Sequence, residues 1–283
     1  MLTRPIPLFR RLLLELQSNC NRSCFFCNRP WDDSGKRIDA QGGHVLRSMP
    51  TEHALRIMRE AVALGFQGKI AFHHMSEPFL DPRIIEMATA AKRLGLHPYE
   101  HTNGDVLRRD DELCRAAVDV FDYIVVGLYD YETDSERDAE MAFWRNRLKG
   151  ADVRFGLGED VFPRSLTPMD PRMFREKQPY PGGVCRLPIE RLIVHYDGNV
   201  ALCCEDMKDD FDLGNAFESS VESLWYSEKH VAIIRELEQG RRERFKVCAG
   251  CPIPPPAEVG PADRVLGHLK RTGQQLAAWM SKP

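Results

Sequence analysis

The stretch that decides the fold is Leu12-Leu-Leu-Glu-Leu-Gln-Ser-Asn-Cys20-Asn-Arg-Ser-Cys24-Phe-Phe-Cys27, an apolar run that leads directly into three closely spaced cysteines. Cys20, Cys24 and Cys27 have the spacing CxxxCxxC, and three thiolates on one short loop can hold three corners of a [4Fe–4S] cube. Because the loop carries no fourth cysteine and no histidine, one iron of such a cluster would stay open to a small ligand. The alternative is a zinc ion, although structural zinc normally takes four protein ligands.

Composition and charge limit the classes of protein to consider. The chain has 283 residues, of which 43% are hydrophobic and 29% charged, an ordinary balance for a globular protein with one medium domain and a smaller appendage. A net charge of -3 gives no electrostatic case for binding nucleic acid or an anionic membrane. The start lacks a secretory signal, so we expect a cytoplasmic protein. Nine cysteines in a reducing compartment then indicate metal or redox sites rather than disulfides.

Short apolar runs alternate with amphipathic stretches through the first half of the chain. Such alternation indicates an α/β fold with a parallel sheet, here a partial (βα)6 TIM-like barrel with its chemistry at the carboxyl ends of the strands. The three cysteines follow the first strand and are therefore expected at that end. We predict strands at residues 12–16, 68–72, 96–101, 121–126 and 153–157, with helices at 52–64, 82–94, 110–118 and 132–148 between them.

The second half of the chain has a different pattern. Two apolar runs flank Asp197-Gly198-Asn199 and predict a β-hairpin, and residues 228–239 predict a helix. We therefore divide the chain into a barrel at 1–157, a proline-rich connector at 158–184, a small cysteine-bearing domain of hairpin plus helix at 185–252, and a tail at 253–283 that is predicted to be helical.

A short motif after the second predicted strand strengthens the interpretation of the cysteine loop. The cysteine spacing, Phe26 before the last cysteine and the preceding strand resemble the radical SAM superfamily, whose members use a [4Fe–4S] cluster to cleave S-adenosylmethionine (SAM). Glu77 and Pro78 resemble that family's Gly-Gly-Glu-Pro segment, which receives the amino group of SAM, although Met75 and Ser76 replace the two glycines.

Two further segments match the family's order along the chain. Thr102-Asn103-Gly104 resembles the family's Thr-Asn-Gly segment near the ribose and carboxylate of SAM. Gly127-Leu-Tyr-Asp130 lies where relatives carry Ser-Leu-Asp, but the serine is absent. The resemblance covers residues 10–252 and implies cleavage of SAM to methionine and a 5′-deoxyadenosyl radical. The cofactor-binding residues that it implies are Ser76, Glu77, Thr102, Asn103, Asp130 and Arg154.

Five more cysteines form a second set. Cys185, Cys203 or Cys204, and the pair in Cys248-Ala-Gly-Cys251 supply four thiolates, with the predicted hairpin between the first two. This order resembles the SPASM/twitch auxiliary domains, and the number of cysteines suits the shorter twitch form with one extra [4Fe–4S] cluster. A closed structural zinc is the alternative. The metal ligands implied for the two clusters are Cys20, Cys24, Cys27, Cys185, Cys203, Cys248 and Cys251.

Three side chains are candidates for the chemistry itself. Adjacent strand residues point to opposite faces, so Cys203 and Cys204 cannot easily ligate one cluster. In peptide epimerases of this family the spare neighbour returns a hydrogen atom to a substrate radical, which makes Cys204 the candidate hydrogen donor; an idle neighbour of a ligand is the alternative. His73 and His74 end the second strand and are a candidate acid–base pair, with packing histidines as the alternative.

The resemblance narrows the chemistry without naming the substrate. We expect a radical SAM enzyme that modifies a ribosomally synthesised peptide, since peptide maturases are common among twitch enzymes. The alternatives are oxidation or epimerisation of an aminocyclitol or aminoglycoside-type sugar alcohol, and a non-catalytic iron–sulfur electron carrier. The expected partners are a peptide or small-molecule substrate, an external one-electron donor such as a flavodoxin or ferredoxin, and a separate peptide-recognition protein.

Overall fold

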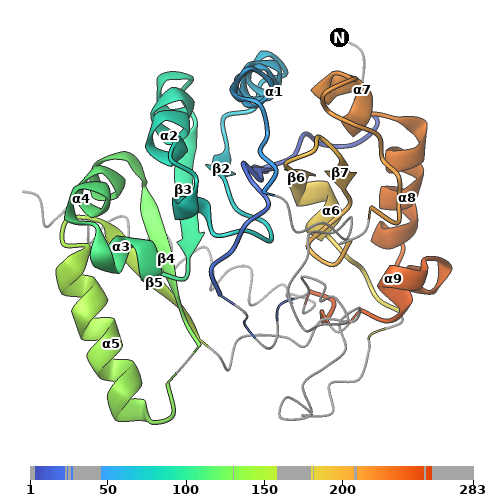
Figure 1. Cartoon of the computed structure of the whole chain (residues 1–283). Helices are drawn as coiled ribbons and strands as arrows, with labels where there is room; N and C mark the ends of the chain where they lie inside the picture. Colours follow the sequence, from blue (N-terminus) through green and yellow to red (C-terminus); the bar gives the residue numbers. More distant parts are fainter. Residues whose placement is uncertain are drawn as a thin grey trace, which may run out of the picture.

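The computed structural model describes residues 4–22, 24, 27, 46–129, 131–157, 180, 182–206, 209–251 and 253–256. At its centre is a seven-stranded sheet in the order β5-β4-β3-β2-β1-β6-β7, in which β1 to β6 run parallel and β7 is antiparallel to β6 (Figure 1). The strands are β1 (Arg11–Leu14), β2 (Lys69–Ala71), β3 (His97–Thr102), β4 (Tyr123–Leu128), β5 (Asp152–Leu157), β6 (Arg191–Val194) and β7 (Val200–Ala201).

Helices lie around the outside of this sheet, with α5 and α4 on the left in the view of Figure 1, followed toward the right by α2, α1 and α7. None of the helices in the described ranges is long and apolar enough to cross a membrane. The helices are α1 (Thr51–Ala63), α2 (Ile84–Arg93), α3 (Asp105–Arg109), α4 (Asp111–Val120), α5 (Asp134–Arg147), α6 (Leu187–Glu190), α7 (Val221–Trp225), α8 (Glu228–Glu238) and α9 (Lys246–Ala249), with short 3-10 helices η1 (Pro78–Leu80) and η4 (Arg242–Arg244).

Alternation along the strands gives the sheet two different faces. Leu12 and Leu14 of β1 belong to the large core that also contains the buried residues of the helices. Leu13 belongs to a separate small cluster, which is made of Leu13, Ala71, Tyr99, Tyr123, Ile193 and Ala201. This small cluster fills the inner face of the sheet. Its member Leu13 and the neighbouring Val125 also line the cavity that holds the candidate site.

The predicted α/β class is confirmed, and every strand and helix predicted for residues 12–157 is present with ends that differ by at most two residues. Helix α5 begins later than predicted because Thr133 and Glu136 form a capping box there. The short helices α3 and α7 are absent from the prediction, since five residues carry too little periodicity. Most of the connector and of the predicted helical tail lies outside the described residues.

Strand β6 belongs both to the predicted hairpin and to the central parallel sheet. The hairpin is present, and β6 pairs with β7 around a turn at which Gly198 has a φ of 89°. However, β6 also pairs in parallel with β1, from Arg11↔Arg191 to Leu14↔Val194, so it is the sixth parallel strand of the central sheet. Its apolar residues are buried on both faces, as is typical of a strand inside a parallel sheet. The sheet therefore continues across the predicted boundary at residue 184.

Candidate active site

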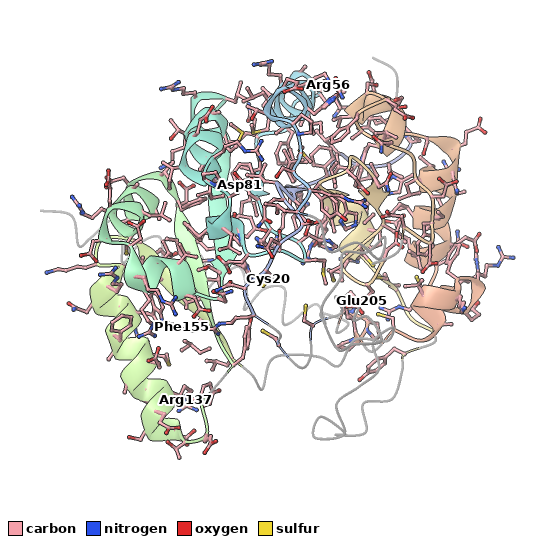
Figure 2. The ribbon with its side chains drawn as sticks, in the orientation of Figure 1. Cys20, Arg56, Asp81, Arg137, Phe155 and Glu205 are labelled. Atoms are coloured by element: carbon pink, nitrogen blue, oxygen red, sulfur yellow. The ribbon has the colours of Figure 1, made fainter. Side chains whose placement is uncertain are left out.

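Three cysteines and the ends of neighbouring strands surround one cavity. Its volume is about 310 Å³, and side chains at or just beyond the carboxyl ends of β2, β3 and β4 complete the lining. The three thiols are partly exposed. Figure 2 shows Cys20 near the centre of the molecule, on the side away from Arg56 of α1. The predicted site residues that line this cavity are Cys20, Cys24, Cys27, Ser76, Glu77, Thr102, Asn103 and Cys204.

Glu77 joins two of the motifs found in the sequence. It is 3% exposed and caps η1, where its Oε1 accepts a hydrogen bond from Phe79 N at 3.3 Å. Thr102 Oγ1 donates to Oε1 at 2.6 Å, and Asn103 N donates to Oε2 at 2.8 Å. Burial raises the pKa of Glu77 to about 7, although these hydrogen bonds act in the opposite direction. The carboxyl group is thus fixed in position and changes charge near neutral pH.

Polar contacts tie the cysteine loop to the segment that follows β3. Arg22 Nη2 and Nε donate to the two carboxylate oxygens of Asp105 at 2.6 and 2.8 Å, and Asn21 Nδ2 donates to the same carboxylate at 3.0 Å. Asn103 Nδ2 in turn donates to Asn21 Oδ1 at 2.8 Å. The hydrogen bond from Arg22 lowers the pKa of Asp105. The residues after Cys20 are therefore held against the Thr102-Asn103-Gly104 segment.

The hydroxyl group of Ser76 is buried and has no hydrogen-bond partner among the described residues. The same side chain lines the cavity together with the cysteines and Glu77. Buried polar atoms are nearly always paired, so this hydroxyl indicates that a polar ligand belongs in the cavity. With the Glu77 carboxyl group beside it, the position fits the amino-acid end of a ligand such as SAM.

His73 is paired with Glu100 rather than with its neighbour His74. Its Nδ1 contacts Glu100 Oε1, while Glu100 Oε2 accepts a hydrogen bond from Phe72 N at 2.8 Å. Burial raises the pKa of Glu100 to about 8. Burial, and to a lesser extent the charge of Arg191, lowers the pKa of His73 to about 4. Between about pH 4 and pH 8 the pair is therefore uncharged, with Glu100 protonated and His73 neutral. His73 also lines the cavity, and Nε2 is the ring nitrogen that does not contact Glu100.

A second buried pair, which sequence reasoning missed, joins the ends of β1 and β6. His195 Nδ1 lies 3.0 Å from Glu15 Oε2, and its Nε2 lies 3.4 Å from Asp209 Oδ1. Burial alone would lower the pKa of His195, but the hydrogen bond and charge of Glu15 outweigh it and raise the pKa to about 9. The ligand atoms of Glu15, His74 and His195 lie within 4.8 Å of one another, a group that could hold a metal ion. Since Glu15 and His195 neutralise each other, the pair is stable without one.

The second set of cysteines encloses a much smaller cavity. Cys185, Cys203, Cys248 and Cys251 line a space of about 20 Å³ together with Arg242. Burial raises the pKa of Cys248 to about 12 and that of Cys251 to about 11, and it raises the pKa of Cys203 well above its usual value. Thiols buried in this way ionise only with a positive partner, and a metal centre supplies it. The donor set therefore fits a closed metal site with four sulfur ligands.

Cys204 opens into the other cavity. It lines the 310 Å³ cavity with the three N-terminal cysteines, whereas Cys203 lines the small cavity of the second set. The next residue, Glu205, which lies to the right of Cys20 in Figure 2, lines the small cavity with Cys203. The geometry thus gives the second set one cysteine of the pair and leaves the other thiol facing the first cavity.

Two predicted cofactor residues are not placed at the cavity. Arg154 lies on β5, where it pairs with Asp152 at 2.5 Å and its guanidinium carbon lies 3.8 Å from the ring centroid of Tyr123. Tyr123 begins β4, so Arg154 lies toward the amino ends of these strands, away from the cysteines. This position gives no support to the expected contact between Arg154 and SAM. Asp130 lies outside the described residues.

A second cavity, of about 600 Å³, continues from the first toward α5. Trp144 and acidic side chains of α5 line its far part. The residues that line both cavities are Arg22, Asn103, Gly127 and Tyr129. The two cavities together offer room for more than one small molecule.

Comparison with protein families agrees with this arrangement. The model of the radical SAM superfamily matches residues 14–152, and the model of SPASM, an iron–sulfur cluster-binding domain, matches residues 185–252. The chain is a radical SAM enzyme with a C-terminal SPASM-type domain. It uses a radical-SAM [4Fe–4S] cluster, an auxiliary cluster and SAM. The non-catalytic electron carrier considered from the sequence is therefore set aside.

Individual proteins resemble the chain over most of its length. It is 23% identical over 257 residues to the SAM-dependent 2-deoxy-scyllo-inosamine dehydrogenase of Niallia circulans, covering 86% of this chain and 93% of the relative. The structure of BtrN in complex with AdoMet and 2-DOIA has a TM-score of 0.68 at 20% identity and covers 87% of this chain and 94% of BtrN. Streptococcus suis SuiB bound to precursor peptide SuiA has a TM-score of 0.50 at 13% identity, covering 87% and 70%. These structural similarities show a shared fold.

Proposed function

We propose that this radical SAM enzyme oxidises a ring alcohol of an aminocyclitol to a ketone. The observation that carries the proposal is the similarity to the N. circulans dehydrogenase, which extends over nearly all of both chains. The sequence alone favours modification of a ribosomally synthesised peptide. The comparisons favour the alternative, which is action on an aminocyclitol, because the fold is more similar to BtrN, solved with AdoMet and 2-DOIA, than to peptide-bound SuiB.

The size of the site supports a small substrate. Pockets for small molecules and cofactors usually measure about 300–1,000 Å³. The two connected cavities, of about 310 and 600 Å³, fall in this range. The larger one extends toward α5, so SAM and a single-ring substrate can share the space without the open groove that a peptide chain requires.

The residue assignments for the cofactors are part of this proposal. Cys20, Cys24 and Cys27 would hold the first cluster, and Glu77 would receive the amino group of SAM with Ser76, Thr102 and Asn103 around it. When bound, the first cluster and SAM supply a 5′-deoxyadenosyl radical and the auxiliary cluster supplies a one-electron acceptor. The ligands proposed for the auxiliary cluster are Cys185, Cys203, Cys248 and Cys251.

The proton of the alcohol is the part of the reaction that the chain itself must handle. Oxidation of a secondary alcohol to a ketone removes one hydrogen atom from carbon, one proton from oxygen and one electron. We assign the proton to His73, which lines the cavity and is held through Nδ1 by Glu100. Above the Glu100 pKa of about 8, Nδ1–H of the neutral imidazole donates to the Glu100 carboxylate, so Nε2 can accept the proton and the carboxylate stabilises the resulting cation.

The proposal is tested with the anaerobically reconstituted enzyme, a chemical reductant, SAM and a panel of aminocyclitols headed by 2-deoxy-scyllo-inosamine, each carrying deuterium on the ring carbons. We expect deuterium in the released 5′-deoxyadenosine and one ketone for each molecule of it, measured by mass spectrometry. Deuterium transfer from a precursor-type peptide, with none from any aminocyclitol, would show that the proposed substrate class is wrong. The natural electron donor, a flavodoxin or ferredoxin, stays a prediction from the sequence.

A paired substitution tests the role of His73. In His73→Gln we expect ketone formation to slow by about 100-fold while SAM binding is kept, because removal of a positioned base typically costs about two to four orders of magnitude. His97→Gln is the matched control, since His97 lies at the start of β3 with its side chain 60% exposed and pairs only with Asp122 at the surface. Equal rates in the two variants would remove His73 from the mechanism.

One observation favours a second function, epimerisation of a ring carbon. Cys204 lines the cavity of the three cysteines, where a thiol could return a hydrogen atom to a substrate radical. In deuterium oxide an epimerase would incorporate deuterium into its product, and Cys204→Ala would abolish product formation. Under the oxidation proposal we expect a product lighter by two hydrogens and little effect of Cys204→Ala.

A further inference from the structure

Arg242 is a fully buried cation beside the second set of cysteines. It is 1% exposed, although its neighbours in η4 are surface residues. Arg241 and Arg244 both pair with Glu236, at 2.5 and 2.8 Å, and the side chain of Arg244 is 59% exposed. Arg242 turns the other way and lines the small cavity with Cys185, Cys203, Cys248 and Cys251.

The hydrogen bonds that this guanidinium group makes with described residues are all to uncharged acceptors. Nε donates to Gly183 O at 3.0 Å, Nη2 donates to Val184 O at 3.0 Å, and Nη1 donates to Ile253 O at 2.6 Å. These carbonyl groups lie just before Cys185 and just after Cys251, so Arg242 joins the two ends of the cysteine set. No carboxylate of the described residues forms an ion pair with it, although Glu205 lines the same cavity.

A buried charge with no counter-charge is costly, and proteins rarely keep one. The four cysteines that line the same cavity as Arg242 become a source of negative charge when they ligate a metal as thiolates, in addition to the Glu205 carboxyl group that also lines it. Four thiolates around a [4Fe–4S] core give a complex with net negative charge, and one-electron reduction makes that charge more negative by one unit. The guanidinium group therefore interacts more favourably with the reduced complex than with the oxidised one.

We propose that Arg242 is the counter-charge of the auxiliary cluster and raises its reduction potential. The charge makes the reduced form more stable, so the cluster accepts an electron more readily. The consequence for catalysis, easier uptake of the electron from the substrate radical, rests on the proposed alcohol oxidation. The effect on the potential itself does not depend on any substrate.

The test measures the potential of the auxiliary cluster alone. The triple variant Cys20→Ala/Cys24→Ala/Cys27→Ala removes the first set of ligands, and EPR-monitored redox titration then follows the remaining cluster. We expect Arg242→Gln to weaken reduction about tenfold, which is about 59 mV for a one-electron couple. Arg244→Gln removes the same charge from the same short helix at the surface and should leave the potential unchanged.

Arg242→Lys makes the charge itself adjustable. Arginine stays charged at every pH that the protein tolerates, whereas a buried lysine loses its proton readily. We expect the potential of Arg242→Lys to fall as pH rises from 7 to 10, while the wild type stays level. The nearby carboxyl groups of Glu205 and Asp206 are present in both proteins, so the difference between the two curves isolates residue 242.

Two results would overturn the proposal. The first is an Arg242→Gln potential equal to that of Arg244→Gln in protein with full auxiliary iron. The second, which also decides the matter if Arg242→Gln does not retain iron, is an Arg242→Lys potential about 59 mV below that of the wild type at pH 7, where both residues carry the charge. Either would leave Arg242 with a purely structural role. No substrate enters these measurements, so failure of the alcohol-oxidation proposal would leave them intact.

Discussion

The two cysteine sets of this enzyme are built in opposite ways. Cys20, Cys24 and Cys27 come from one short loop, are partly exposed and face a cavity of about 310 Å³. The second set comes from three distant segments and encloses only about 20 Å³. Under the proposed assignments, the first arrangement leaves room for a reactant at its metal, and the second closes its metal off. The difference would separate the proposed SAM site from the proposed place where an electron is stored.

Removal of one ligand from the open set is expected to have the largest effect. Cys24→Ala should abolish release of 5′-deoxyadenosine, because two cysteines cannot hold the cluster that binds SAM. Iron analysis should show about four of about eight irons retained, since the closed set is built from other segments. Loss of iron from both sets would break the comparison and show that they assemble together.

The adjacent pair at the hairpin sharpens the comparison further. Cys203→Ala should remove the auxiliary cluster and lower ketone formation severely, whereas Cys204→Ala should retain all iron. The reason is that Cys203 lines the closed cavity and Cys204 the open one. The measurement is iron content together with the optical spectrum of each variant. Iron loss in Cys204→Ala instead would reverse the assignment.

An intermediate effect is expected at Glu77, where the open cavity meets the amino end of SAM. Because burial raises the pKa of this carboxyl group to about 7, it becomes protonated below that pH and loses its attraction for an ammonium group. SAM affinity, measured by equilibrium binding, should therefore fall as pH drops below about 7. Glu77→Gln should bind at least tenfold more weakly at pH 8 and show no such pH dependence. A wild-type affinity that is level from pH 8 to pH 5.5 would contradict this role.

The smallest effect is expected at the buried pair of Glu15 and His195, which joins the ends of β1 and β6. The folded-state pKa of His195, about 9, lies above the usual 6.5. Its pairing with Glu15 therefore stabilises the fold fully below pH 6.5 and is lost as pH rises through about 9, with a total of about 3 kcal/mol. Urea unfolding should show a loss of this size between pH 7 and 10 in the wild type that is absent in His195→Gln. Parallel pH curves for both proteins would refute it.

The sequence predicted features that are made by residues close together in the chain, but not features that are made by residues far apart in it. The barrel elements and the loop of three cysteines depend on residues close together in the chain, and local periodicity and spacing reveal such features. The pairing of β6 with β1 depends instead on distant segments: Glu15 and His195, which lie at the ends of these strands, are 180 residues apart. Glu100 was missed for the same reason. Its buried carboxyl group contacts His73, which lies just beyond the end of β2.

Arg242 and Arg154 show the limit for single charged residues. In the sequence, Arg242 belongs to a basic run that is most simply explained as a solvated helix end, and only the backbone carbonyls around it show that it is buried. Arg154 follows the expected order of motifs along a strand, but its side chain lies toward the wrong end of that strand. Sequence position specifies the element, whereas the direction of a side chain depends on its neighbours in space.

The parallel pairing of β1 with β6 also sets an order of events during synthesis. Strand β2 reaches β1 early, but the other edge of β1 has no partner until residues 191–194 have been made. Contacts between such distant segments form slowly, and an open strand edge is prone to pair with other chains. A growing chain therefore presents its first three cysteines on an incomplete sheet, before the strand that completes the other edge of β1 has been made.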